Sequence, residues 1–380
     1  MTYNLVMKAM LLLGGNGDTL DANVFLNLLK EMKVRKISAP DNISYATVIN
    51  ALSKSTRRTE LDTANQVLAL LAEMKKSREP GLRPDRVTYN SVLKALVPIT
   101  ADEITDRCFD LLEEMKSSTL AKPDDITYAA LMARIAGSVE TGNFNAIDKC
   151  TKLLAEMGGK ANVVHCNIFL NALVKRSTKG DPTASDKCLR FLGEMSISEN
   201  SRPDKITYNT VLNFLVKLAI EGDTSAPGKC LVLLKEMSDS EQDTKPDLIS
   251  YSTVMKAYAN MAEQGDRSAA ATQLELLKDM STVGVSPDIY IYSIVLQTLV
   301  SSVGHGDVSA TDDCMHILNH LKASGLPSIL PNTIIYTKVL NAFVQRANQG
   351  DDSSLETCLF LLAEMKKSPH SMPDVVSYSR

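Results

Sequence analysis

The side chains of this chain that could do chemistry recur at regular intervals and do not gather in one segment. Two polar positions repeat beside a tyrosine: an Asn, Ser, Thr or Ala directly after it, and an Asp or Asn, usually preceded by Pro, that closes the interval. Their amide, hydroxyl and carboxylate groups offer hydrogen-bond donors and acceptors. An Asp at such a place is also a common helix N-cap. The tyrosine positions are Tyr3, Tyr45, Tyr89, Tyr128, Tyr208, Tyr251, Tyr292, Tyr336 and Tyr378, with Cys166 in the remaining one.

No pattern typical of an active site accompanies these columns. His316 and His320 have a metal-like spacing, but no third ligand or His-Glu-x-x-His pattern goes with them. The glycine-rich run at 14–17 lacks the Lys-Ser/Thr ending of a phosphate-binding loop. No nucleophile, base and orienting acid recur together. We therefore expect no enzyme activity, no cofactor, no metal and no small-molecule substrate.

The cysteines follow the same register. Five of the seven lie 22 residues after the tyrosine position, and Cys108 reaches that place after a three-residue deletion. Val67 and Phe25 occupy it in other intervals. A position that accepts Cys, Val or Phe is a buried apolar one, and none of the spacings resembles a Cys-x2-Cys zinc site. The sequence predicts neither a zinc site nor a disulfide.

Each interval of 38 to 44 residues predicts a helical hairpin. In residues 205–247 the apolar positions Tyr208, Val211, Leu212 and Leu215 follow the i, i+3, i+4, i+7 rule of one helix face. A glycine and an aspartate then mark a turn, and a second helix with the same period follows. This helix ends in a Glu-Met pair, for which we expect a buried Met and a solvated Glu. The glutamates are Glu31, Glu73, Glu114, Glu156, Glu194, Glu236 and Glu364.

The repetition predicts an all-α, right-handed α-solenoid superhelix of about nine helix-turn-helix repeats in a single array over 1–380. Such a stack buries apolar surface between neighbours and needs no single globular core. The expected repeats are 1–41, 42–85, 86–124, 125–162, 163–204, 205–247, 248–288, 289–332 and 333–374, with a partial repeat at 375–380.

The bulk composition restricts the partners. The net charge of −4 counts against a nucleic-acid binder, although a stripe of lysines can coexist with an acidic outer face. The sequence holds no apolar run long enough for a membrane span, so we expect no membrane partner. No transit peptide is visible, since Met1 already lies inside the first repeat, and we expect the chain to be a fragment of a longer protein.

The pattern Pro-Asp-x-[Ile/Val]-[Ser/Thr]-Tyr, followed by a second helix ending in Leu-Leu-x-Glu-Met, resembles the pentatricopeptide repeat family over essentially the whole chain. The repeats are longer than the family's own unit. The resemblance implies sequence-specific binding of single-stranded RNA, one base per repeat, in organellar RNA processing, stability or translation. It also implies a mitochondrial or chloroplast location and other RNA-processing proteins as further partners.

By this resemblance, the residue after the tyrosine and the residue that closes the repeat read one base together. Asn with Asp implies uracil, Ser or Thr with Asp implies guanine, and Ser with Asn implies adenine. The nine pairs are Asn4/Asp41, Ala46/Asp85, Asn90/Asp124, Ala129/Asn162, Asn167/Asp204, Asn209/Asp247, Ser252/Asp288, Ser293/Asn332 and Thr337/Asp374.

Two further columns are expected to contact RNA. The residue two before the tyrosine would stack on bases, and lysines five after it would meet phosphates. The stacking residues are Ile43, Val87, Ile126, Val164, Ile206, Ile249, Tyr290 and Ile334, and the lysines are Lys8, Lys94 and Lys256. Three alternatives stay open: the polar columns act only as helix caps, the array is a scaffold for a protein or peptide in its groove, or the chain is part of an enzyme whose catalytic domain lies outside this fragment.

Overall fold

In a computed structural model, the chain consists of helical hairpins. The structure describes residues 2–13, 21–35, 39–55, 59–77, 79–99, 102–139, 142–143, 145–177, 182–240, 244–367 and 371. Within these ranges it holds eighteen α-helices, three short 3-10 helices and no strand. This confirms the predicted all-α repeat fold. The chain divides into two compact units, Met1–Arg202 and Pro203–Arg380, and the division falls close to a predicted repeat boundary.

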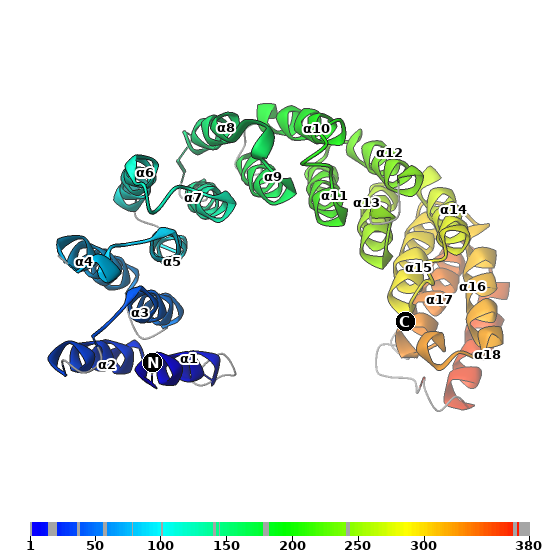
Figure 1. Cartoon of the computed structure of the whole chain (residues 1–380). Helices are drawn as coiled ribbons and strands as arrows, with labels where there is room; N and C mark the ends of the chain where they lie inside the picture. The colour runs from blue at the N-terminus through cyan, green and yellow to red at the C-terminus, as the bar shows by residue number, and fades with distance from the viewer. Residues whose placement is uncertain are drawn as a thin grey trace. The chain divides into compact units, whose positions relative to one another are not determined.

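The first unit contains five hairpins. Figure 1 shows their odd-numbered helices beside one another, with the even-numbered helices in a second row. The first helices are α1 (Thr2–Leu13), α3 (Asn42–Lys54), α5 (Arg86–Leu96), α7 (Asp125–Ser138) and α9 (Val163–Ser177). The second helices are α2 (Ala22–Val34), α4 (Glu60–Lys76), α6 (Asp102–Ser117), α8 (Ala146–Met157) and α10 (Pro182–Ser196). The 3-10 helices η2 (Pro80–Leu82) and η3 (Gly158–Lys160) follow α4 and α8.

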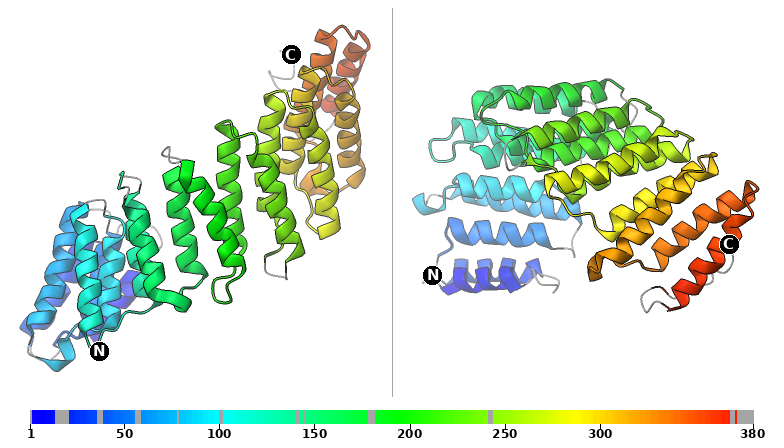
Figure 2. Two further views of the ribbon diagram at one scale, coloured as in Figure 1. Left: turned by 90° about the horizontal axis from the view of Figure 1, so that it is seen from above. Right: turned by 90° about the vertical axis from the view of Figure 1, so that its right-hand side faces the viewer.

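The second unit contains four hairpins of the same kind, and Figure 2 shows their helices running alongside one another. The first helices are α11 (Lys205–Ile220), α13 (Leu248–Glu263), α15 (Ile289–Gly304) and α17 (Thr333–Asn348). The second helices are α12 (Ala226–Asp239), α14 (Ser268–Val283), α16 (Ala310–Ser324) and α18 (Ser353–Lys367). The 3-10 helix η5 (Pro327–Ile329) follows α16.

In each unit, a first helix packs on the first helices before and after it. The second helices pack against the first helix of their own repeat and against that of the next repeat. A residue on the shared face of these helices is therefore buried by three elements at once. The closing methionines are all buried core residues: Met32, Met74, Met115, Met157, Met195, Met237, Met280 and Met365.

The turn inside the hairpin depends on its glycine. Gly222 has a φ of 108°, a conformation that a side chain would strain. The N–H of the following Asp223 donates to the carbonyl of Leu218 at 2.9 Å, and its carboxylate accepts from the N–H of Ser225 at 2.8 Å. This one turn ends α11 and starts the approach to α12. Gly17 and Gly180, the matching glycines of two other repeats, lie outside the described residues.

The cysteine column is buried, as the sequence predicts. All seven cysteines are free thiols, and all but Cys358 are buried. Burial raises the pKa of Cys150 and of Cys230 to about 12. Gln273 takes the same place in the seventh repeat, where its amide donates to the Met255 carbonyl at 2.7 Å. In the part of the chain that the structure describes, no group of three metal-ligating side chains occurs, and no helix is long and apolar enough to cross a membrane.

Most glutamates of the Glu-Met pairs are exposed, as expected, but four of the seven also bind side chains of their own repeat and of the repeat before it. The hydroxyl of Tyr45 donates to Glu73 at 2.8 Å, and Lys33 of the preceding repeat reaches the same carboxylate at 2.6 Å. The Lys33 ammonium also lies over the Tyr45 ring, 5.4 Å from its centre. The tyrosine is buried while the carboxylate stays half exposed, so each trio joins the two helices of one repeat to the repeat before it. The same trio recurs as Lys75–Glu114–Tyr89, Lys116–Glu156–Tyr128 and Lys322–Glu364–Tyr336.

Glu73→Gln should lower the free energy of unfolding by about 1 kcal/mol at neutral pH, since it removes the charge that two partners bind. Burial raises the pKa of Glu73, but the bonds from Lys33 and Tyr45 outweigh it and hold the pKa below its ordinary 4.5. The stabilisation is thus present above that ordinary value and lost as pH falls through the lowered pKa. The free energies of unfolding of the wild type and of Glu73→Gln, measured with urea, should become equal in acid.

Glu275→Gln is the matched control, because Glu275 is exposed on α14 and makes no hydrogen bond or ion pair with any described residue. An equal loss of stability in the two variants at neutral pH would show that the trio contributes nothing between repeats.

Candidate functional site

The residue that closes each repeat is the N-cap of the next first helix. Its side chain accepts a hydrogen bond from the backbone N–H three residues later, which satisfies one of the amides left open at a helix start. The bond measures 2.8 Å at Asp41 and Asp85, 3.0 Å at Asp124 and Asp247, 2.7 Å at Asp204, 2.9 Å at Asp288 and 3.1 Å at Asn332. Asn162 accepts from the N–H of Val164 at 3.1 Å. Asp374 lies outside the described residues.

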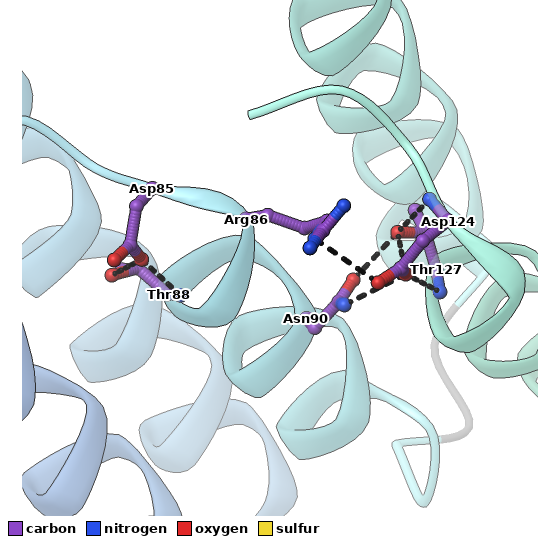
Figure 3. Close-up of polar contacts among 6 residues, drawn as sticks. All are labelled: Asp85, Arg86, Thr88, Asn90, Asp124 and Thr127. Atoms are coloured by element: carbon purple, nitrogen blue, oxygen red, sulfur yellow. Dashed lines mark hydrogen bonds and ion pairs between the residues drawn. The ribbon is translucent and has the colours of Figure 1, made fainter. Parts of the chain in front are cut away.

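Two of the predicted pairs are joined directly. The Asn4 amide donates to both carboxylate oxygens of Asp41, at 3.0 and 3.1 Å. The Asn90 amide donates to Asp124 at 3.0 Å (Figure 3). Burial raises the pKa of Asp124, but hydrogen bonds from Asn90 and Thr127 and the nearby charge of Arg86 hold it below its usual value. Each carboxylate therefore stays ionised at neutral pH and keeps its partner amide oriented.

A hydroxyl just before the tyrosine completes this network. The hydroxyl of Ser44 lies 2.8 Å from both Asn4 Oδ1 and Asp41 Oδ1. Thr127 bonds to Asn90 and Asp124 in the same way, and Ser250 to Asn209 and Asp247. Because a carboxylate can only accept, the amide nitrogen faces it and the amide oxygen faces the hydroxyl. The reasoning from sequence missed this third member, although a Ser or Thr before the tyrosine was its signal.

Several other predicted pairs consist of different side chains or make different contacts. Ala46 and Ala129 have no polar side chain. The hydroxyls of Ser252 and Thr337 donate to carbonyls of their own helices, those of Ile249 and Thr333. For Ser293 and Asn332 no mutual bond occurs among the described contacts. Asn167 lies on α9 in the first unit, whereas Asp204 caps α11 in the second.

The predicted stacking residues form an exposed apolar column. All eight lie one position inside the start of a first helix, beside the polar network, and each is between 48% and 66% exposed. Their neighbours on the same helices, such as Tyr45 and Val48, are buried. Their exposure is therefore a property of this one register position, repeated in every hairpin that carries it.

The predicted phosphate lysines are exposed on the first helices. Lys256 lies over the ring of Tyr290, 5.5 Å from its centre, so it meets the stacking column of the next repeat. In the corresponding position of α15 stands Gln297, which accepts from Lys338 of α17 at 2.7 Å. Burial lowers the pKa of Lys338. These two residues line a pocket of about 630 Å³ between α15 and α17, into which Ile334 and Thr337 also project.

The first residue inside the helix adds a charge beside some of the pairs. Arg86 Nε lies 3.1 Å from Asp124 Oδ2, and the Lys205 ammonium lies 3.7 Å from Asp247 Oδ2. In the fourth repeat, Asp125 occupies this position. The closing residue of that repeat is the neutral Asn162, whose amide lies 3.5 Å from the Asp125 carboxylate. The sequence analysis did not single out this position.

The comparisons with known proteins agree with this architecture. A model of the pentatricopeptide repeat domain matches residues 27–98 and 232–302. The chain thus carries pentatricopeptide repeats in both of its compact units. A chloroplastic pentatricopeptide repeat-containing protein of Arabidopsis thaliana is 32% identical over 126 residues, which are 33% of this chain and 14% of that protein. The chain thus spans only a small part of this longer relative.

Two solved structures resemble this pentatricopeptide repeat chain. The crystal structure of the maize pentatricopeptide repeat protein PPR10 matches with a TM-score of 0.53 and 21% identity, over 100% of this chain and 45% of that one. The likeness is one of fold. The structure of yeast Rmd9p in complex with a 16-nucleotide target RNA matches with a TM-score of 0.40 and 11% identity, over 92% of this chain and 73% of that one.

Asp85 allows the cap role to be measured alone, because its predicted partner Ala46 has no polar side chain. Asp85→Ala should lower the free energy of unfolding by about 1 kcal/mol, the usual cost of losing an N-cap. Asp85→Asn should leave it nearly unchanged, because Asn caps as well as Asp. Denaturant unfolding of the three proteins decides the matter: an Asn variant as unstable as the Ala variant would contradict the cap role.

Proposed function

We propose that this pentatricopeptide repeat chain binds single-stranded RNA in a sequence-specific way, one base per repeat, without catalysis of its own. The setting we propose is RNA processing, stability or translation in a mitochondrion or chloroplast, together with other RNA-processing proteins. The presence of these repeats supports one-base-per-repeat reading. The chloroplastic name of the Arabidopsis relative supports an organellar setting.

The observation that carries the proposal is the exposed apolar column beside the polar network. Apolar side chains at one position in successive repeats form an exposed surface, and a ligand that covers it removes apolar area from water. The face of a nucleobase fits it, since bases stack on such platforms without regard to sequence. The edge of the same base would then meet the amide and carboxylate of the adjoining pair, whose donors and acceptors can distinguish bases.

The charge distribution is compatible with a polyanion on this side of the hairpins. Exposed lysines of the first helices lie near the apolar column, and Lys256 touches its member Tyr290. Four glutamates of the second helices are neutralised locally, because they are paired with lysines of the preceding repeats. The net charge of −4 of the whole chain therefore does not describe the electrostatic potential at the first helices.

Binding of synthetic oligonucleotides tests the proposal. We expect the chain to bind single-stranded RNA in preference to duplex RNA, with affinity falling as salt rises through counterion release. Fluorescence anisotropy with the nine-nucleotide RNA UCUCUUGAG, its duplex and a random RNA measures this; C fills the two positions of the Ala pairs. Tight binding of a peptide, with no binding of any RNA at low salt, would replace the proposal with the protein-scaffold alternative.

Asn209→Ser tests base reading, with Asp247 and the cap Asp204 left in place. The pair code read along the chain gives U-x-U-x-U-U-G-A-G, where x marks an Ala pair, and Asn209 belongs to the sixth position. If Asn209 reads the base, preference there should shift from uracil toward guanine by about 1–3 kcal/mol, the usual size of one base-edge contact. Competition between RNAs with U or G at that position measures the shift. An unchanged preference refutes base reading and leaves the fold intact.

A further inference from the structure

The third repeat differs from the other described Asn–Asp pairs in having an arginine on its carboxylate. Arg86 is the first residue of α5, next to the exposed Val87 of the apolar column. Its side chain is 54% exposed, and that of Asp124 beneath it is 28% exposed. Figure 3 shows the guanidinium reaching across to Asp124 on the side where Asn90 also meets it. Arg86 thus covers the pair that the family code assigns to this repeat.

The polar atoms of that pair are already occupied within the protein. Asp124 Oδ1 accepts from Asn90 Nδ2 and from the Thr127 N–H, both at 3.0 Å, and the Thr127 hydroxyl lies 2.9 Å from it. Oδ2 forms an ion pair with Arg86, whose Nε lies 3.1 Å away. Asn90 Oδ1 accepts from Thr127 at 2.7 Å, and Asn90 is only 7% exposed. The terminal amino groups of Arg86 are the donors left open, because they bond to no described residue.

We propose that Arg86 is a specificity-determining residue of this repeat, whose guanidinium occupies the Asp124 carboxylate and presents two amino groups to the base, so that guanine is selected. The inference rests on the proposed RNA binding and departs from the uracil that the Asn90/Asp124 pair alone implies. Two adjacent N–H groups match the O6 and N7 acceptors of guanine. Uracil instead presents an imino N–H, which would have to approach the Asp124 carboxylate oxygen that the Arg86 guanidinium already faces.

The sixth repeat provides a matched comparison with the same Asn and Asp. Lys205 stands where Arg86 does, but its ammonium is 3.7 Å from Asp247 Oδ2, beyond hydrogen-bond distance. Asn209 is also less buried than Asn90. A lysine is a point charge without the planar donor fork of arginine. Asp247 therefore keeps an acceptor for a base, and uracil remains the base expected there.

The test uses the full chain with Arg86→Met, Arg86→Lys and the control Lys205→Met. The probes are four nine-nucleotide RNAs, UCNCUUGAG, that differ only in the third base, and a matched set that varies the sixth base. The wild type should bind the third-position G probe about tenfold more tightly than the U probe. Both Arg86 variants should lose this preference in favour of U, while the sixth-position preference stays unchanged. Lys205→Met should leave the third-position preference unchanged.

The outcomes separate the possible roles of Arg86. Equal weakening of all four third-position probes in Arg86→Met would make Arg86 a phosphate contact and overturn the inference. A guanine preference retained in Arg86→Lys would show that a positive charge alone suffices. It would overturn the proposal that the two amino groups of the guanidinium select guanine. Uracil preference at the third position in the wild type would also overturn it. Failure of the wild type to bind any of these RNAs would instead remove the proposed function. Unchanged melting temperatures, expected for a half-exposed ion pair, exclude misfolding.

Discussion

The capping hydrogen bond at the start of each first helix is the interaction on which the rest of this structure depends. A helix start leaves backbone N–H groups without partners, and a short acceptor directly before it satisfies one of them. Asp41 and Asp124 do so while also accepting from an asparagine on the preceding first helix. One carboxylate therefore fixes the start of one helix and the side-chain orientation on another. Local folding and the geometry of the candidate site are coupled through the same atoms.

This coupling explains why polar and apolar columns lie side by side. The cap sets the first turn of the helix, so the next residues take fixed directions. The second residue after the cap points outward and is Ile43 or Ile126. The hydroxyl of the third residue points back to the cap carboxylate. The tyrosine then turns into the core, where its hydroxyl meets a carboxylate of the second helix. A single turn thus presents an apolar face, a polar edge and a core anchor in fixed order.

The Lys–Glu–Tyr trios supply the register between neighbouring repeats. A carboxylate that is bound by a tyrosine of its own hairpin and a lysine of the preceding one can serve both only if the two hairpins stack in one way. Individually such half-exposed contacts contribute little. The three trios of the first unit and the one of the second specify which face of one hairpin meets the next. Buried Met, Leu and Cys side chains supply most of the stabilisation.

The sequence by itself determined the hairpin, the repeat register and the buried columns, because helix periodicity and interchangeable Cys, Val and Phe are local signals. It also located the caps, since a Pro-Asp pair directly before a run with helical apolar spacing indicates the start of a helix. Only the tertiary structure decided which side chains of different repeats meet. That Glu73 binds Lys33, and that Arg86 covers Asp124, depends on how the helices of successive repeats are placed. Positions about 40 residues apart come into contact through stacking. The repeat interval records that separation, but it does not say which side chains meet across it.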